Sequence, residues 1–533
     1  MRTKKLAAVA LLATLSIFAV WAAVGQDSLL RVGFSWPTYI DPGVGSDFSS
    51  SSAMVNLYDS LVYPTPEGTV IPHAADSWEI SDDNLTYTFH IRPGITFHTG
   101  GEMTAEDVKF SMDRLLTLGE GYGYLFLGSV AGVEVIDTYT VEITLSEPFG
   151  PFLFSLVRFY ILSKDAVMAN LGEGPYGDYG DYGKTWLLSN DAGSGAYTVA
   201  EFPFEEYLLL DLFPGYWGEV APNAAQQVKM LRSPDAVTVK ALMARRELEI
   251  TDPWQPEESM VSMDAIDGVD IAAFPNSLSQ YLMLHNTKAP TDDIQIRKAL
   301  SYMLDYEQVV NIIFPGSLQA HGPVATVLPG YKEGLFQYSR DLDKAREALQ
   351  KSKYYGSLDE YPIVFGVNTD VPALEKLALL FQANAAEIGL NVELIKMPWG
   401  KMVEVVGSQE ETPNVLAINV APHYPEAGSM LQAKYHSSNV GTWEQAEWML
   451  DPMLDQLIDD ALGTIDEAAR FEKYGLIQQV IVELVPDVFL FELLEKHAYQ
   501  AEYVSWPQPS NPNSVMGYNY DFRFIEVFPD RIP

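Results

Sequence analysis

The chain has 533 residues, of which 47% are hydrophobic and none is cysteine, and its formal net charge is −39. Such an acidic balance argues against nucleic acid as a partner, because neutralising phosphates requires clustered Lys and Arg, and it disfavours docking on anionic lipid. Without cysteine, a disulfide framework, a thiolate zinc site and a cysteine nucleophile are excluded, and we expect no lipoprotein anchor.

The first 25 residues have the pattern of a secretory signal. Arg2, Lys4 and Lys5 precede an apolar run from Leu6 to Val24, and small residues follow at the expected cleavage point. The apolar run is close to the ~20 residues that span a bilayer, so an uncleaved anchor is the alternative. We expect a cleaved signal peptide over 1–25 and a mature chain that is periplasmic or extracellular.

The N-terminal third is predicted to mix strands and helices. Alternating apolar and polar residues indicate half-buried strands, and Thr104 with Asp107 forms a capping box that starts a helix. A Ser/Gly-rich loop is expected after Asp41-Pro42. The predicted elements are strands at 29–36, 85–91 and 133–145 and helices at 53–61 and 104–116.

The rest of the chain alternates strands with helices. Between 342 and 397 the order is helix, strand, helix, strand, which favours a parallel or mixed sheet with helices packed on it. We therefore predict a mixed α/β protein. The predicted strands are 207–212, 248–250, 279–286, 362–367, 390–397 and 488–491, and the predicted helices are 234–245, 342–351, 373–388 and 467–485.

Four stretches contain long and specific sequence motifs. They are Pro-x-x-Ala-x-Ser-Trp-Glu from Pro72 with Leu-Thr-Tyr-Thr-Phe-His-Ile-Arg from Leu85, Met-Thr-Ala-Glu-Asp-Val-Lys-Phe-Ser from Met103, Gly-Ser-Gly-Ala-Tyr from Gly193, and Asp-Asp-Ile-Gln-Ile-Arg-Lys-Ala-Leu from Asp292. Together they closely resemble the extracellular solute-binding proteins of family 5, the peptide/nickel-type receptors of ABC importers. The resemblance covers most of the chain from about Leu29.

This resemblance implies a two-lobed periplasmic binding protein-like fold of type II. It has an extra small domain in the first lobe and two crossing strands that act as a hinge. We expect lobe I to comprise 26–51, 185–278 and 493–533, the small domain 52–184, and lobe II 279–492 with the hinge strands. A monomer is expected.

The sequence contains none of the common catalytic motifs. The chain has no His-Glu-x-x-His, no Gly-x-Ser-x-Gly and no P-loop, and its eight histidines do not pair at metal-ligand spacing. We therefore expect no enzyme, no catalytic residue, no metal site and no cofactor. The contrasting class is a secreted hydrolase that uses paired carboxylates, although 72 acidic residues make such pairs common by chance.

Aromatic residues in loops are the first candidates for ligand contact. Trp254 and Trp399 each follow a predicted strand, and Trp443 lies beside a Glu-rich turn. Such rings can stack on a peptide plane or a sugar ring when two lobes close, although a packing role is the simpler alternative. Asn286, at the end of the first crossing strand, is a candidate for gripping a ligand backbone.

The loop Val420 to Glu426 departs from the family. Peptide receptors of this family commonly carry Asp-Tyr-Pro-Asp-Pro here, and its first aspartate holds the ligand's α-ammonium by a charge-assisted bond. In this chain His423 takes that place, Tyr424 follows, and Glu426 replaces the second acid. The amine anchor is then missing or moved to Glu426, which favours a sugar or another neutral solute, unless His423 is only a loop residue.

The sequence thus predicts a receptor that captures a small peptide between two lobes and delivers it to the permease subunits of an ABC importer. An oligosaccharide receptor of the same family is the alternative. A sensor that reports to a membrane kinase is a third possibility. In each case closure around the ligand supplies the mechanism, without a covalent step.

Overall fold

The computed structural model describes residues 28–34, 37–203, 205–232 and 235–532. The predicted signal peptide, 1–25, lies outside these ranges. None of the helices within them combines the length and the apolarity that a membrane crossing requires.

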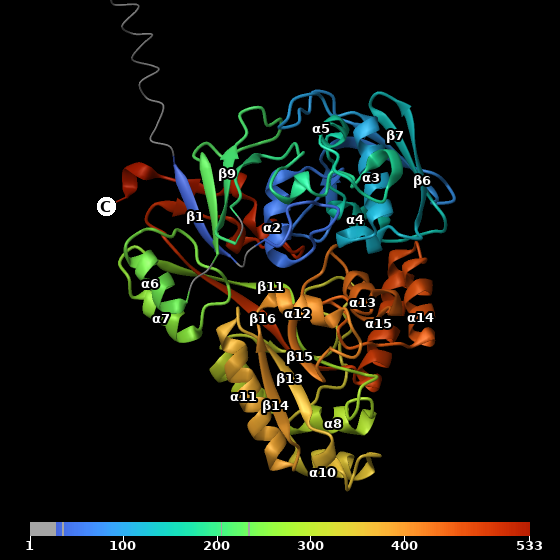
Figure 1. The fold of residues 1–533 in the computed structure, drawn as a ribbon, viewed down its shortest axis with the longest axis vertical. Coiled ribbons are helices and arrows are strands. Elements are labelled where there is room, and N and C mark those ends of the chain that lie inside the picture. The colour runs from blue at the N-terminus through green and yellow to red at the C-terminus, as the bar shows by residue number, and fades with distance from the viewer. Residues whose placement is uncertain (1–27, 35–36, 204, 233–234, 533) are drawn as a thin grey trace, which may run out of the picture.

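Helices and strands are interspersed along the described residues (Figure 1). The helices are α2 (Phe48–Leu57), α3 (Ala105–Leu118), α4 (Phe152–Ser155), α5 (Lys164–Ala169), α6 (Ala236–Ala244), α7 (Glu257–Asp264), α8 (Ile294–Met303), α9 (Tyr306–Gln308), α10 (Leu342–Lys351), α11 (Pro372–Glu387), α12 (Trp399–Val406), α13 (Ala427–Tyr435), α14 (Pro452–Leu462) and α15 (Glu467–Leu484). The strands are β1 (Leu29–Phe34), β2 (Val62–Pro64), β3 (Val70–Pro72), β4 (Ala75–Ile80), β5 (Thr86–Ile91), β6 (Val130–Asp137), β7 (Thr140–Leu145), β8 (Tyr197–Glu201), β9 (Tyr207–Leu212), β10 (Gln227–Arg232), β11 (Asp270–Leu284), β12 (Leu318–Gln319), β13 (Ile363–Asn368), β14 (Val392–Met397), β15 (Val415–Val420), β16 (Asp487–Tyr499), β17 (Val504–Ser505) and β18 (Glu526–Val527).

Lobe I is built on a four-stranded sheet of order β1-β10-β9-β8, at the upper left of Figure 1. β1 and β10 are parallel, and β10, β9 and β8 are antiparallel. The small domain, at the upper right, has its own antiparallel sheet of order β4-β5-β7-β6, against which α3 packs. The capping box predicted at Thr104 is present, and its backbone N–H donates to Asp107 at 2.9 Å.

Two elements near the N-terminus differ from the prediction. The single strand expected over 133–145 is a hairpin of β6 and β7, because a turn at Asp137–Thr140 reverses the chain. Helix α2 begins at Phe48 rather than near Ala53, since Asp47 caps it by accepting from the Ser50 N–H at 2.8 Å. Serines that suggested a loop therefore form the first turns of a buried helix.

Lobe II is built on a six-stranded mixed sheet of order β12-β16-β11-β15-β13-β14. Alternate residues of β11 point to opposite faces of this sheet: Leu282 and Leu284 pack with α8, α10 and α11, whereas Tyr281 and Met283 pack with α13 and α15. Each face of the sheet is thus covered by helices, as a sheet buried on both sides requires.

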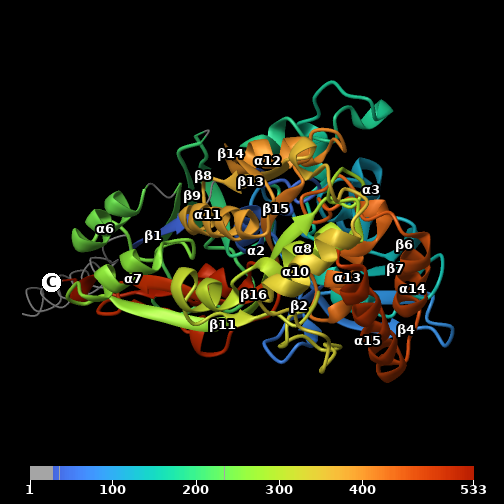
Figure 2. The same ribbon diagram turned by 90° about the horizontal axis from the view of Figure 1, so that it is seen from below.

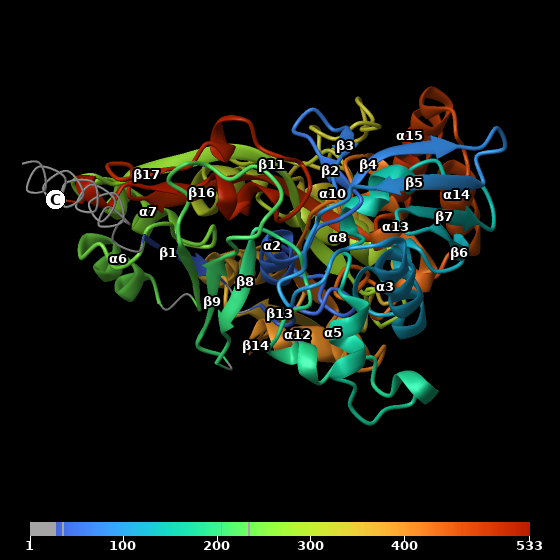
Figure 3. The same cartoon turned by 90° about the horizontal axis from the view of Figure 1, so that it is seen from above.

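The two crossing strands exist and are longer than predicted. Residues 270–275 of β11 pair with 494–499 of β16, beside lobe I, where Ile250 bridges both Val32 and Tyr499. After an irregularity between Pro275 and Ser279, the remainder of β11 joins the lobe II sheet. Figures 2 and 3 show β11 and β16 running side by side between the two lobes. The residue boundaries predicted for the lobes stay a prediction.

A buried ion pair ties lobe I to the small domain. Both guanidinium NH groups of Arg114, on α3, donate to the two carboxylate oxygens of Asp41 at 2.8 and 2.6 Å, and its Nε donates to the Tyr182 carbonyl. Both side chains are at most 3% exposed. A buried guanidinium of this kind depends on its partner, because an unpaired buried charge is very costly.

We expect Asp41→Asn to lower the free energy of unfolding by about 3 kcal/mol or more, because it leaves Arg114 buried without its countercharge. The matched control is Asp113→Asn, which breaks the exposed Lys109–Asp113 pair on the same helix and should cost less than about 0.5 kcal/mol. Urea denaturation measures both changes, and equal effects would contradict the importance of the buried pair.

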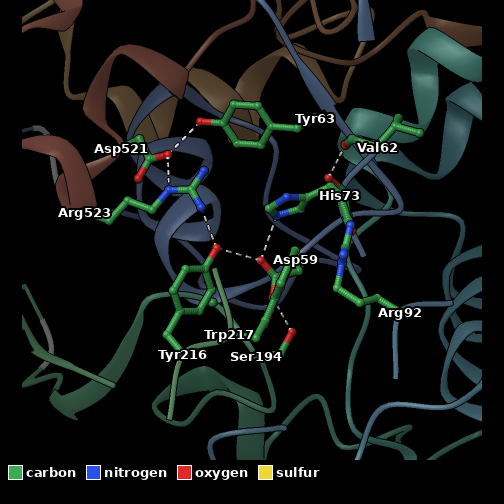
Figure 4. Close-up of polar contacts among 12 residues, drawn as sticks. Asp59, Val62, Tyr63, His73, Arg92, Ser194, Tyr216, Trp217, Asp521 and Arg523 are labelled. Carbon is green, nitrogen blue, oxygen red and sulfur yellow. Dashed lines mark hydrogen bonds and ion pairs between the residues drawn. The ribbon is translucent and has the colours of Figure 1, made fainter. Parts of the chain in front are cut away.

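A second polar cluster surrounds Asp59, at the end of α2 (Figure 4). Its carboxylate accepts from His73 Nε2 at 2.9 Å, from the Ser194 hydroxyl at 2.8 Å and from Trp217 Nε1 at 2.9 Å. Tyr216 adds a longer contact at 3.4 Å. Three separate segments of the chain therefore converge on one carboxylate.

The same cluster fixes the C-terminal segment. Arg523 donates to Asp521 at 2.8 Å and to the Tyr216 hydroxyl at 2.6 Å, and Tyr63 donates to Asp521 at 2.6 Å. These contacts, which Figure 4 shows, anchor the C-terminal segment of lobe I.

Asp59 should make stability depend on pH in the acid range. Burial opposes its ionisation, but the hydrogen bonds from His73, Trp217 and Ser194 outweigh burial and lower its pKa below the usual 3.8. Its contribution is then complete above about pH 4 and is lost as the pH falls through the lowered pKa. Thermal unfolding between pH 2 and 6 should therefore show a shallower pH dependence for Asp59→Asn than for the native chain.

The exposed acid Asp82 provides the control. Asp82→Asn should leave the pH dependence of the native protein unchanged. A pH dependence of Asp59→Asn equal to that of the native chain would contradict the role given to Asp59.

Candidate functional site

A cleft between the two lobes contains a pocket of about 690 Å³, which we call the inner pocket. Lobe I contributes the start of α2, a tryptophan loop and the C-terminal segment, and lobe II contributes its sheet and the loops that follow it. The residues that line the inner pocket are Asp47, Phe48, Ser49, Trp254, Leu278 and Met516 from lobe I, and Asn368, Val371, Leu374, Trp399, Ala417, Ile418, Asn419, Ala421 and Trp443 from lobe II.

The position of this pocket follows from the topology of lobe II. β13 is parallel to both β14 and β15, so the carboxyl ends of all three strands meet at one edge of the sheet. Asn368 ends β13, Trp399 follows β14, and Asn419 lies near the end of β15. Open α/β sheets bind ligands outside the carboxyl ends of such strands.

Two further hollows adjoin the inner pocket. A larger outer cleft of about 2280 Å³ shares Trp254 and Trp399 with it and is also lined by charged residues of both lobes, among them Arg232 and Lys401. A side pocket of about 540 Å³ shares Trp254, Val371 and Asn419. Trp254 therefore lines the inner pocket, the outer cleft and the side pocket.

Three of the seven predicted ligand residues line this cleft. Trp399 and Trp443 lie edge to face, with ring centroids 5.6 Å apart, and Trp254 makes the same kind of contact with Phe48 at 5.9 Å. The backbone N–H of Trp254 donates to Asp252 at 2.8 Å, and that of Trp399 donates to Asp370 at 2.8 Å. These bonds hold an aromatic pair on each side of the cleft.

The other four predicted residues lie away from the inner pocket and the outer cleft. His423 is fully buried, its Nε2 hydrogen-bonds to Glu444, and its ring lies edge-on to Tyr122 and Tyr124 of the small domain. Tyr424 is also fully buried, with its hydroxyl 3.4 Å from Gln432. Both side chains are engaged within the protein.

Glu426 and Asn286 have internal partners as well. Glu426 pairs with Arg470 at 2.9 Å and accepts from the Tyr474 hydroxyl at 2.7 Å. Burial raises the pKa of Glu426, and the ion pair opposes that rise. Asn286 donates to the Leu284 carbonyl at 2.7 Å. A ligand role for any of these four residues stays a prediction.

Sequence reasoning missed several lining residues, notably Asp47, Phe48, Asn419 and Met516. Asp47 and Phe48 stand at the edge of a stretch that was expected to be loop. Asn419 sits inside an apolar strand, where a single polar residue could have signalled a site. Met516 belongs to the C-terminal segment, in which no strand or helix was predicted.

One buried arginine connects the small domain to both lobes. Arg158 donates from Nε to the His423 carbonyl of lobe II at 3.0 Å and from NH2 to the Met516 carbonyl of lobe I at 2.6 Å. Its guanidinium also lies 5.0 Å from the centre of the Tyr122 ring. Since charged donors form strong hydrogen bonds, Arg158 holds the small domain against segments of both lobes.

We expect Arg158→Met to weaken closure, since each hydrogen bond from a charged group contributes about 1.5–3 kcal/mol. Small-angle X-ray scattering of the purified variant should give a larger radius of gyration than the native chain, with a lower melting temperature. Arg245→Met, which removes an exposed arginine of lobe I, is the control and should leave both unchanged. Native-like scattering from Arg158→Met would refute this link.

Comparison with known proteins agrees with this architecture. The family model for bacterial extracellular solute-binding proteins, family 5 (middle), matches residues 69–442. The probable D,D-dipeptide-binding periplasmic protein DdpA of Escherichia coli (strain K12) is 26% identical over 479 residues, covering 88% of this chain and 89% of that protein.

Two solved structures share the fold. The periplasmic binding protein DppA from Helicobacter pylori, in complex with the peptide STSA, has a TM-score of 0.81 and 22% identity, covering 94% of this chain and 98% of that one. The dipeptide-binding protein from Pseudoalteromonas sp. SM9913, in complex with Met-Leu, has a TM-score of 0.82 and 20% identity, covering 94% and 100%.

Proposed function

This chain belongs to the bacterial extracellular solute-binding proteins of family 5, and from that membership we propose that it captures a short peptide between its lobes and delivers it to the membrane permease of an ABC importer. On this proposal the signal peptide over 1–25 is cleaved, and the mature protein works as a monomer outside the cytoplasm. No covalent step and no cofactor is required.

The proposal rests on one observation: residues of both lobes line the same pocket. Phe48 and Trp254 face it from lobe I, and Trp399 and Trp443 face it from lobe II. A ligand in the pocket touches both walls only when the lobes are closed, so its binding energy favours the closed state. β11 and β16 are the only described strands that pair along both lobes, and they are the expected hinge.

A peptide fits the shape of the cleft. The inner pocket continues into the outer cleft, so an extended ligand can pass from one to the other beside Trp254 and Trp399. The names of the relatives, which refer to a D,D-dipeptide, to the peptide STSA and to Met-Leu, support the same ligand class.

An oligosaccharide is the second candidate. The pocket's tryptophans can stack on sugar rings as well as on peptide planes, and His423 stands where peptide receptors of this family commonly carry an acid. A receptor of either kind differs from a secreted hydrolase in returning its ligand unchanged.

We expect native mass spectrometry of freshly purified protein to detect a copurified peptide. When that peptide is added back to stripped protein, X-ray scattering should show a smaller radius of gyration, because the ligand stabilises closure. Chromatography should then recover the peptide intact. Cleaved peptide would indicate a hydrolase, and a bound sugar would replace the peptide with the second candidate.

A further inference from the structure

The charge of the inner pocket is of one sign, negative. Among the described residues that line it, Asp47 is the one charged side chain, and none is Lys, Arg or His. Asp47 is half-buried and caps α2 by accepting from the Ser50 N–H at 2.8 Å. A ligand group that enters this pocket therefore meets a carboxylate and no protein cation.

Burial makes this carboxylate costly to ionise. It raises the pKa of Asp47 above 3.8, although hydrogen bonds from the start of α2 oppose the rise. A partly desolvated carboxylate is stabilised when an opposite charge comes to rest beside it. Since the lining residues offer no such charge, the ligand is the group that can supply it.

A second acceptor in the pocket also lacks a donor. The Oδ1 atom of Asn419 is buried, and no described group donates a hydrogen bond to it. Asn419 lines both the inner pocket and the side pocket. A buried acceptor without a partner is unfavourable, so this oxygen suits a ligand N–H or O–H group.

The aromatic rings favour the same kind of ligand. Phe48 and Trp254 lie on one side of the pocket, and Trp399 and Trp443 lie on the other. The faces of aromatic rings carry negative charge and attract cations, and tryptophan does so most strongly. Aromatic walls, one carboxylate and an unpaired amide oxygen together match an ammonium group, which has three donors and a positive charge.

We propose that the inner pocket binds a positively charged amine of the ligand and that Asp47 is the side chain that holds it. This assignment rests on the proposed function and specifies its ligand. It locates the amine anchor away from the 420–426 loop, where His423 is buried against Glu444 and Glu426 is paired with Arg470. The rest of the ligand extends toward the outer cleft.

The amine has two possible sources in a peptide, the N-terminal α-ammonium and a lysine side chain. Four probes distinguish them by isothermal titration calorimetry at pH 7: Leu-Leu, N-acetyl-Leu-Leu, N-acetyl-Lys-Leu and the neutral sugar cellotriose. The native chain should bind Leu-Leu or N-acetyl-Lys-Leu at least tenfold more tightly than N-acetyl-Leu-Leu, which carries no cation.

The protein variants test whether Asp47 is the anchor. Asp47→Asn removes the charge, and Asp47→Ser removes it while keeping a residue that caps helices well, so a folded variant is available even if one of them is unstable. Both should bind Leu-Leu, N-acetyl-Lys-Leu and N-acetyl-Leu-Leu with nearly equal affinity. The matched control is Asp451→Asn, which removes the acid that caps α14, away from the inner pocket and the outer cleft, and should keep the native preference.

Three results would each overturn a stated part of the proposal. Equal native affinity for peptides with and without an ammonium group would overturn the amine pocket and leave the peptide function standing. A preference that persists in both Asp47 variants would overturn the role of Asp47. Binding of cellotriose without binding of any peptide would overturn the proposed function and the inference together.

Discussion

The antiparallel pairing of β11 with β16 is the constraint on which the rest of the molecule depends. Each strand takes part in lobe I at one end and in the lobe II sheet at the other, so the backbone hydrogen bonds between them hold both halves in one frame. The irregularity between Pro275 and Ser279 interrupts the ladder between the two ends. Leu278, at that interruption, lines the inner pocket, so the hinge and the ligand site share residues.

Several of the scarce basic residues lie at junctions between parts of the molecule. The chain has 33 Lys and Arg against 72 Asp and Glu, yet several arginines are almost fully buried. Arg114 joins lobe I to the small domain, Arg158 joins the small domain to both lobes, and Arg470 holds the loop after β15 through Glu426. Burying a guanidinium is favourable only where its donors are satisfied, so these contacts fix particular segments against one another.

Local patterns in the sequence predicted much of the fold. The bounds of β9 and α10 match the prediction, because each is a short amphipathic segment between clear breaks. The crossing strands were predicted too short, since Pro275 and Asn276 break the apolar pattern of β11 while pairing continues on either side. For the ligand site, the three loop tryptophans that were named as candidates do line the cleft. Asp47 could not be recognised, since its position depends on serines becoming the first turns of a helix.

The C-terminal segment has a consequence for folding. Met516, which lines the inner pocket, is translated after every other residue that lines it, and it belongs to a segment that contacts around Asp521 and Arg523 hold in place. The inner pocket is therefore complete only after this late segment of the chain has been synthesised and has folded.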